Sequence, residues 1–298
     1  MSEKLRIGYF ADGIWAHEAF RFLISDDSLE IKFICVRYDT ADPVLKEFAD
    51  RYQIDYLKHR DINSTAFLQK ISQYHCDLFI SMSFDQIFKD GILSLPTRGT
   101  INCHAGKLPF YRGRNVLNWV LINDEKEFGI TVHFVDEGID TGDIILQRTY
   151  PITDQDDYGT LLETAHVKCA EVLYEAVRLI QEGSHQPRKQ NAIHPCGFYC
   201  GKRKAGDERI VWNQSSRDIF NFIRALCKPG PMATTTLHDS VLKINRSEMI
   251  DNAPRYRGIP GQVVGLTSTG IIVKTKDTTI KLTEHEYEGM IRLGDRMI

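Results

Sequence analysis

Two polar residues stand two positions apart at the end of a short apolar segment near the middle of the chain. The segment 99–103 reads Gly-Thr-Ile-Asn-Cys, and His104 follows it. Alternate residues of a strand point to the same side, so the side chains of Asn102 and His104 are expected to meet on one substrate atom. An amide donates a hydrogen bond to an oxyanion and an imidazole accepts a proton near neutral pH, so the pair suits acyl transfer. Alone, such a pair is more often structural.

A longer motif follows this pair. Residues 108–119 read Leu-Pro-Phe-Tyr-Arg-Gly-Arg-Asn-Val-Leu-Asn-Trp, and an acidic turn at 136–143 reads Asp-Glu-Gly-Ile-Asp-Thr-Gly-Asp. With Asn102, His104 and these two segments in this order, the chain resembles the formyltransferases that take their one-carbon unit from 10-formyltetrahydrofolate. The resemblance extends over the whole chain, because the larger members of that family also carry a barrel-like module beyond a connecting strap.

The resemblance implies a mechanism and three catalytic residues. A primary amine attacks the formyl carbon, Asn102 stabilises the tetrahedral oxyanion, and His104 moves the proton that the amine loses to the folate nitrogen. Asp140 holds the imidazole, and a neighbouring carboxylate favours the charged form of that ring. Without the resemblance, Asp140 would be interpreted as a turn residue.

The resemblance also implies a folate pocket. The segment after the third predicted strand is expected to lend backbone groups to the pterin ring, while Arg114 and the acidic loop line the same pocket. The residues predicted to contact 10-formyltetrahydrofolate are Phe84, Gln86, Ile87, Phe88, Arg114, Asp136, Glu137, Gly138 and Ile139. Phe84 and Phe88 could equally be core residues.

Other cofactors are not expected. The segment 8–13 after the first predicted strand lacks the G-x-G-x-x-G spacing of a dinucleotide-binding loop, so NAD is not predicted. His194, Cys196 and Cys200 superficially suggest metal ligands, but a fourth ligand at the usual spacing is missing, and no metal is predicted. The basic cluster 202–204 is interpreted as a solvated charge run.

Short apolar runs alternate with longer amphipathic stretches from the N-terminus onward. This pattern predicts an α/β fold, with a doubly wound, mostly parallel, Rossmann-like sheet covered by helices on both faces. Such sheets bind ligands at the carboxyl ends of their strands, which is where Asn102 and His104 stand. The predicted strands are 5–10, 31–36, 77–81, 99–103, 129–135 and 144–152, and the predicted helices are 15–24, 42–52, 65–74 and 158–181.

The character of the sequence changes after residue 183. Residues 1–183 are predicted to form the formyltransferase catalytic domain, and the polar, Gly- and Pro-punctuated segment 184–207 is predicted to be a linker or strap. Residues 208–298 are predicted to form a small, β-rich, barrel-like C-terminal domain, because short runs of Thr, Val and Ile follow a helix expected at 216–227.

The composition is that of an ordinary globular protein. Hydrophobic residues make up 42% and charged residues 26% of the 298 residues, and 37 Lys and Arg against 40 Asp and Glu leave a net charge of −3. These values exclude collagen-like, disordered and membrane-spanning classes. Seven scattered cysteines favour free thiols, and the N-terminus shows neither a signal peptide nor a transmembrane segment. A cytoplasmic protein without a membrane partner is therefore expected.

The resemblance leaves three acceptor classes open: methionyl-tRNA, glycinamide ribonucleotide and a nucleotide-linked amino sugar. The chain is longer than the glycinamide ribonucleotide enzymes. Residues 206–298 hold 13 Lys and Arg against 11 Asp and Glu, which is a weak electrostatic footprint for tRNA. Residues 105–107 (Ala-Gly-Lys) replace the Ser-rich segment expected of the tRNA enzymes, and the segments 114–123 and 219–235 look more like the sugar enzymes.

We therefore expect an N-formyltransferase that acts on a dTDP- or UDP-linked amino-deoxysugar for surface polysaccharide, with a 4-amino group favoured over a 3-amino group. The first alternative is a methionyl-tRNA formyltransferase. The second is a non-catalytic folate-binding or interaction protein on the same scaffold. A homodimer through the C-terminal region is compatible with the resemblance.

Overall fold

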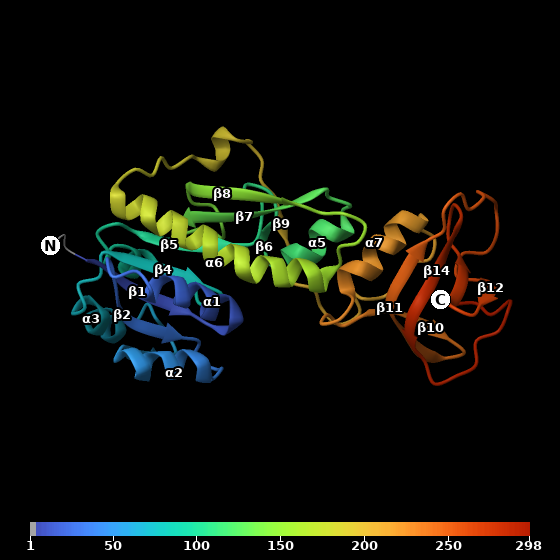
Figure 1. Cartoon of the computed structure of the whole chain (residues 1–298), viewed down its shortest axis with the longest axis horizontal. Coiled ribbons are helices and arrows are strands. Elements are labelled where there is room, and N and C mark those ends of the chain that lie inside the picture. Colours follow the sequence, from blue (N-terminus) through green and yellow to red (C-terminus); the bar gives the residue numbers. More distant parts are fainter. Residues whose placement is uncertain (1–3) are drawn as a thin grey trace. The chain divides into compact units, whose positions relative to one another are not determined.

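The computed structural model describes residues 4–298, which form two compact units (Figure 1). The first unit takes in the chain up to Gly113 together with Gly129–Tyr150 and Thr164–Tyr199, and the second takes in Arg114–Phe128, Pro151–Glu163 and Cys200–Ile298. The chain therefore passes between the units several times. The predicted domain limits at residues 183 and 207 divide the sequence into continuous segments, whereas each unit combines several segments. These limits stay a prediction.

A seven-stranded sheet forms the centre of the first unit, in the order β3-β2-β1-β4-β5-β7-β8. β1 pairs in parallel with β2 and β4, and β4 pairs in parallel with β5, whereas β5 and β7 are antiparallel. The mostly parallel, Rossmann-like sheet that the sequence predicts is confirmed. Its strands are β1 (Leu5–Ala11), β2 (Leu29–Val36), β3 (Asp55–Lys58), β4 (Leu78–Met82), β5 (Thr100–His104), β7 (Glu127–Phe134) and β8 (Ile144–Pro151).

The central strands are apolar along most of their length, as is typical of parallel sheets that are covered on both faces. All five residues of β4 are buried. Phe10 of β1 packs edge to face on Phe33 of β2 and on Phe79 of β4, with ring centroids 5.4 and 5.3 Å apart. This buried cluster holds the neighbouring strands in a fixed arrangement, and so it fixes the strand ends from which ligand-binding residues project.

Helices flank this sheet. They are α1 (Gly13–Ile24), α2 (Pro43–Tyr52), α3 (Thr65–Ser72), α4 (Asp90–Leu93) and α6 (Tyr158–Glu182), of which residues from 164 onward belong to this unit. Asp42 caps α2 by accepting a hydrogen bond from the Leu45 N–H at 2.9 Å, and a proline occupies the first turn. α1 and α6 lie side by side (Figure 1), where the rings of Trp15 and His166 have centroids 4.4 Å apart.

The strap between residues 184 and 207 contains two short elements. η1 (Gln190–Ala192) is a 3-10 turn, and β9 (Tyr199–Cys200) pairs with β6 (Arg112–Gly113). Arg188 also bridges to Ile144 through backbone hydrogen bonds of 2.8 and 2.9 Å. The strap is therefore bonded along the first unit as far as residue 199, because its backbone groups find partners there.

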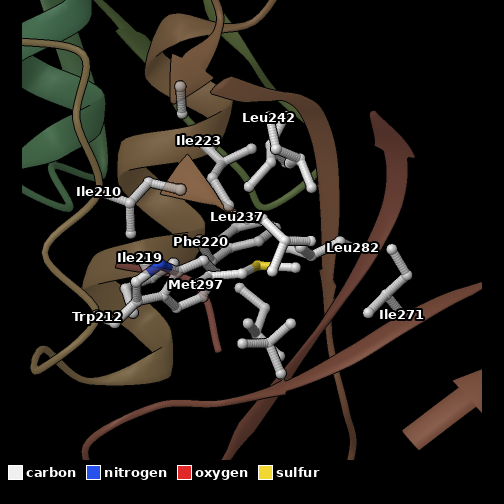
Figure 2. Packing of buried hydrophobic residues seen from close by; sticks show 14 of the residues in the cluster. Ile210, Trp212, Ile219, Phe220, Ile223, Leu237, Leu242, Ile271, Leu282 and Met297 are labelled. Atoms are coloured by element: carbon white, nitrogen blue, oxygen red, sulfur yellow. The ribbon is translucent and has the colours of Figure 1, made fainter. Parts of the chain in front are cut away.

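The second unit contains an antiparallel sheet in the order β10-β11-β14-β13-β12, so the β-rich C-terminal module predicted from the sequence is confirmed. The apolar face of α7 packs against this sheet, and Figure 2 shows Phe220 and Ile223 beside Leu237 and Met297. The elements are α5 (Val116–Ile122), α7 (Ser216–Leu226), β10 (Ala233–Leu237), β11 (Ser240–Met249), β12 (Val263–Thr267), β13 (Gly270–Lys274) and β14 (Thr279–Glu286).

Between residues 4 and 298, no helix is long and apolar enough to cross a membrane. The seven cysteines are free thiols, and five of them are buried. The cytoplasmic location expected from the sequence stays a prediction.

Candidate active site

Asn102 and His104 lie on β5 at the carboxyl end of the parallel part of the sheet. The antiparallel pairing with β7 places His133 opposite Asn102 and Thr131 opposite His104. Both Asn102 and His104 are partly buried, so each side chain is held by the protein and still reaches the surface. The two side chains point to the same side of the strand, as their spacing predicts, and the acidic turn that follows β7 completes the group.

Asp140 of that turn brings the polar side chains together. One oxygen, Oδ2, lies 3.6 Å from Nδ1 of His104 and accepts a hydrogen bond of 2.8 Å from the Gly113 N–H. The other, Oδ1, lies 3.5 Å from Nε2 of His133. Burial by itself would raise the pKa of Asp140, but the charge of His104, the hydrogen bond and charge of His133 and the Gly113 N–H outweigh burial and hold it well below its usual value. The carboxyl group is therefore ionised across the neutral range.

The second ring nitrogen of His104 is also bonded. Nε2 lies 2.7 Å from the carbonyl oxygen of Tyr111. A carbonyl only accepts, so Nε2 donates to it in this arrangement, and Nδ1 faces the carboxylate. Gly106 makes this geometry possible, because a Cβ at that position would lie 2.4 Å from Nε2 and 2.5 Å from the Tyr111 oxygen. Gly106, in the middle of the Ala-Gly-Lys segment, therefore has a steric role beside His104.

His133 is a polar residue of the site that sequence reasoning missed. Its relative exposure is 2%, and Nδ1 donates to the carbonyl oxygen of Phe134 at 2.7 Å. Nε2 then faces both the Asn102 amide nitrogen, at 3.3 Å, and Asp140. The His133 ring therefore lies against both Asn102 and Asp140. The sequence around His133 does not indicate this role, because it is a single histidine within an apolar strand. Only the register between β5 and β7 places it beside Asn102.

Three side chains of the segment predicted to meet the pterin ring, those of Phe84, Gln86 and Phe88, contact other residues of the protein. The rings of Phe84 and Phe88 pack on Phe10 with centroids 5.5 and 5.0 Å away. Gln86 accepts the Ile62 N–H at 3.0 Å and donates to the His59 carbonyl at 2.9 Å. Ile87 is 56% exposed. Contacts from this segment to a ligand would therefore come mainly from its backbone and from Ile87, and they stay a prediction.

The remaining residues predicted to bind folate lie in exposed positions. Asp136 to Ile139 form the outer part of the acidic turn, where Asp136 accepts hydrogen bonds from the Gly138 N–H and the Thr141 hydroxyl at 3.1 and 2.5 Å. Glu137 is likewise exposed. Arg114 belongs to the second unit, and its N–H donates to the Cys200 carbonyl at 3.1 Å. A pocket shared by Arg114 and the acidic turn stays a prediction.

The possible metal ligands of the strap do not gather into a cluster. His194 Nδ1 lies 2.6 Å from the carbonyl oxygen of Cys196, within its own loop. Throughout the part of the chain that the structure describes, no three His, Cys, Asp or Glu side chains are arranged to hold a metal ion.

An α/β sheet that presents an amide, an imidazole and a carboxylate at one strand end has the groups that acyl transfer requires. Residues 34–177 match the family model described as formyl transferase, and residues 202–294 match the model of the formyl transferase C-terminal domain. The chain therefore belongs to the formyltransferase family, as its motifs indicated. The formyl donor of the family is a formyltetrahydrofolate.

Relatives with the higher sequence identities are named methionyl-tRNA formyltransferases. The one from Pelotomaculum thermopropionicum is 37% identical over 87% of this chain and 80% of its own length, and the one from Syntrophus aciditrophicus is 34% identical over 85% and 79%. A solved N-formyltransferase from Helicobacter canadensis, in complex with folinic acid and dTDP-3-aminofucose, has a TM-score of 0.69 and 20% identity, covering 94% of this chain and 99% of that one.

These comparisons overturn the expectation of a nucleotide-sugar acceptor. The sequence identity of 20% to the sugar enzyme indicates a shared fold and nothing about the acceptor. The methionyl-tRNA enzymes, in contrast, are similar in sequence over most of the chain. The preference for a nucleotide sugar over nucleic acid as partner is therefore wrong. It depended on the net charge of residues 206–298, on the Ala-Gly-Lys segment at 105–107 and on the likeness of the segments 114–123 and 219–235 to the sugar enzymes. Binding to phosphates depends on where the positive side chains lie and not on their sum.

Proposed function

We propose that this chain is a methionyl-tRNA formyltransferase, which transfers the formyl group of 10-formyltetrahydrofolate to the amino group of methionine on initiator tRNA. The observation that carries the proposal is the 37% identity to a protein of that name over 87% of the chain. The arrangement of Asn102, His104 and Asp140 at the end of β5 supports the chemistry.

The reaction needs one bond to form and one to break. The methionine nitrogen bonds to the formyl carbon, the bond from that carbon to the folate nitrogen breaks, and one proton passes from the amine to the folate nitrogen. Asn102 donates an amide hydrogen to the oxyanion that develops on the formyl oxygen. His104 carries the proton, and Asp140, whose Oδ2 lies 3.6 Å from Nδ1, orients the ring.

The backbone around His104 suits this role. The Tyr111 carbonyl holds Nε2 while the substrate is absent, so the ring is oriented before the amine arrives. The His133 ring, 3.3 Å from the Asn102 amide nitrogen, restricts that amide. Both groups are thus positioned by neighbours that themselves take no part in the proton transfer, which reduces the reorganisation needed in the transition state.

The decisive experiment supplies the purified protein with 10-formyltetrahydrofolate and either methionyl-tRNA or a panel of dTDP- and UDP-linked amino sugars. Formylmethionyl-tRNA is the expected product. Hydrolysis of its aminoacyl ester bond releases formylmethionine, which is separated from the methionine released by unformylated tRNA. Formylation of an amino sugar without formylation of methionyl-tRNA would reject the proposal. Folate binding without formylation of any acceptor would favour a non-catalytic protein.

A further inference from the structure

Gln190 in the strap is buried, although it lies in a segment that is mostly exposed. Its relative exposure is 4%, whereas Lys189 and Asn191 on either side are exposed. A long polar side chain costs free energy when it is buried, unless its polar atoms are hydrogen-bonded. The partners of its amide therefore indicate why the residue is buried.

Both ends of the Gln190 amide are fully engaged. Nε2 donates hydrogen bonds of 2.8 Å to the carbonyl oxygens of Asp140 and of Gly142. Oε1 accepts hydrogen bonds from Nε and Nη2 of Arg112 at 3.1 and 2.6 Å. All of these residues belong to the first unit. One side chain therefore ties the acidic turn to β6.

The Asp140 backbone needs such support. Its φ angle is +53°, in the left-handed region that costs free energy for a residue with a side chain. The Gln190 amide holds the carbonyl oxygen of this residue, and the Gly113 N–H holds its carboxylate at 2.8 Å. Since Gly113 adjoins Arg112, the bonds from Gln190 fix both the backbone of Asp140 and the strand that meets its carboxylate.

The strap also supports the other side of His104. The ring of Phe198 packs on Tyr111 with centroids 4.9 Å apart, and the Phe198 carbonyl accepts the Arg112 N–H at 3.1 Å. The Tyr111 carbonyl is the group that holds Nε2 of His104. Asp140 and Tyr111, which contact the two imidazole nitrogens, are therefore both in contact with residues 190–198 of the strap.

We propose that Gln190 is a positioning residue for formyl transfer, which acts through Asp140 by holding that carboxylate against His104. The inference rests on the proposed function. Gln190 touches neither the formyl group nor the proton in this assignment, so its loss lowers the rate of the chemical step while it leaves binding of the donor and the acceptor largely intact.

The test uses the full chain and Gln190→Glu, which keeps the size of the side chain and an acceptor for Arg112 but replaces the donor to the two carbonyls. The matched control is Asn191→Asp, the same change of amide to acid at the exposed neighbour. We expect kcat for formylation of methionyl-tRNA to fall about 10- to 100-fold in Gln190→Glu, with KM for both substrates nearly unchanged. The control retains the wild-type kcat.

A double-variant comparison separates positioning from a general structural effect. If Gln190 acts through Asp140, then adding Gln190→Glu to Asp140→Asn changes kcat by no more than about 2-fold, because the interaction is already lost. If the two effects on kcat multiply, Gln190 does not act through Asp140. If Gln190→Glu has a lower melting temperature than Asn191→Asp, Gln190→Met takes its place, because methionine removes the donor without adding a charge. The kcat values of Gln190→Met are then compared with those of the control and of Asp140→Asn in the same way.

Hydrogen exchange gives a readout that does not depend on activity. The Gly113 amide is protected by the Asp140 carboxylate, so its exchange is expected to accelerate in Gln190→Glu, while exchange in the middle of α6 stays as in the wild type. Unchanged protection of Gly113 together with an unchanged kcat would overturn the inference. Absence of formylation by the wild-type protein would instead reject the proposed function, and the exchange result would still report on Gln190.

Discussion

Asp140 has more structural partners than a residue of an exposed turn usually has. Its carboxylate faces two imidazole rings and a backbone N–H, and its carbonyl oxygen is held by Gln190. The motif marks Asp140, Asn102 and His104, because these residues match the signature of the family that the chain resembles. His133 and Gln190 lie outside that motif, so only the folded chain brings them into the group.

Loss of the His104 imidazole tests the proton transfer. We expect His104→Ala to lower kcat for formylation about 100-fold or more, because the variant has no group at this position to carry the proton. Single-turnover formylation of methionyl-tRNA measures the effect, with His285→Ala, an exposed histidine, as the control. A near-normal rate in His104→Ala would remove this residue from the mechanism.

Gly142 tests how tightly the acidic turn is packed. A Cβ at this position would lie 1.9 Å from the Phe134 carbonyl oxygen, so Gly142→Ala must displace the turn that carries Asp140. We expect the free energy of unfolding to fall by about 1–3 kcal/mol. The control is Gly201→Ala, whose Cβ would have no heavy atom within 4 Å. Urea denaturation of both variants measures the difference, and equal midpoints would show that the turn can move aside freely.

At the scale of elements, local signals located most of the fold. The Asp-Pro start of α2 and the apolar runs of β4 and β5 place these elements within one or two residues of their bounds. No element is predicted from the sequence at 116–122, which forms α5, because this helix contacts residues that are far away in the sequence. Asn118 donates to the Ala225 carbonyl at 2.6 Å, across 107 positions. Such a contact leaves no local periodicity.

The end of α1 is joined to α6 through Asp26. Burial alone would raise the pKa of this carboxyl group, but hydrogen bonds from Ser28 and Tyr174 and the charge of Arg178 outweigh burial and lower the pKa of Asp26 to about 2. Its pKa in the unfolded chain is near the ordinary 3.8. The ionised group therefore stabilises the fold above the unfolded pKa, and this contribution is lost as the pH falls through about 2.

Asp26→Asn is expected to lower the free energy of unfolding by about 1–2 kcal/mol at neutral pH, and the deficit is expected to shrink as the pH falls from about 4 to about 2. Denaturation at a series of pH values measures this dependence. Asp27→Asn, at an exposed neighbouring position, serves as the control. A deficit that is constant from neutral pH down to about 2 would show that the charge of Asp26 contributes nothing to stability.

At the scale of the whole molecule, the net charge of −3 does not identify the acceptor. The small excess of positive residues in 206–298 counted against tRNA in the prediction of the acceptor, and the relatives overturn that interpretation. Phosphates are bound by a few cationic side chains at suitable positions. Acidic residues elsewhere on the protein lower the net charge, but they do not prevent those side chains from binding phosphates.

The acceptor can be tested through ionic strength. If the protein binds tRNA through phosphate contacts, KM for methionyl-tRNA is expected to rise about 10-fold or more between about 50 and about 200 mM salt. The KM for 10-formyltetrahydrofolate, measured in the same series, serves as the reference for general salt effects. A KM for methionyl-tRNA that does not rise more steeply than this reference would argue against a phosphate-binding surface.

The sequence by itself determined the class of fold and the family, and it predicted the candidate catalytic group of Asn102, His104 and Asp140, because these depend on short-range patterns and on a motif confined to residues 102–142. Only the tertiary structure decided how that group is held. Gln190 lies 50 positions from Asp140 in sequence and His133 lies 31 positions from Asn102, yet each is within hydrogen-bonding distance. Burial and strand register bring these residues together, and neither can be read from the spacing of the chain.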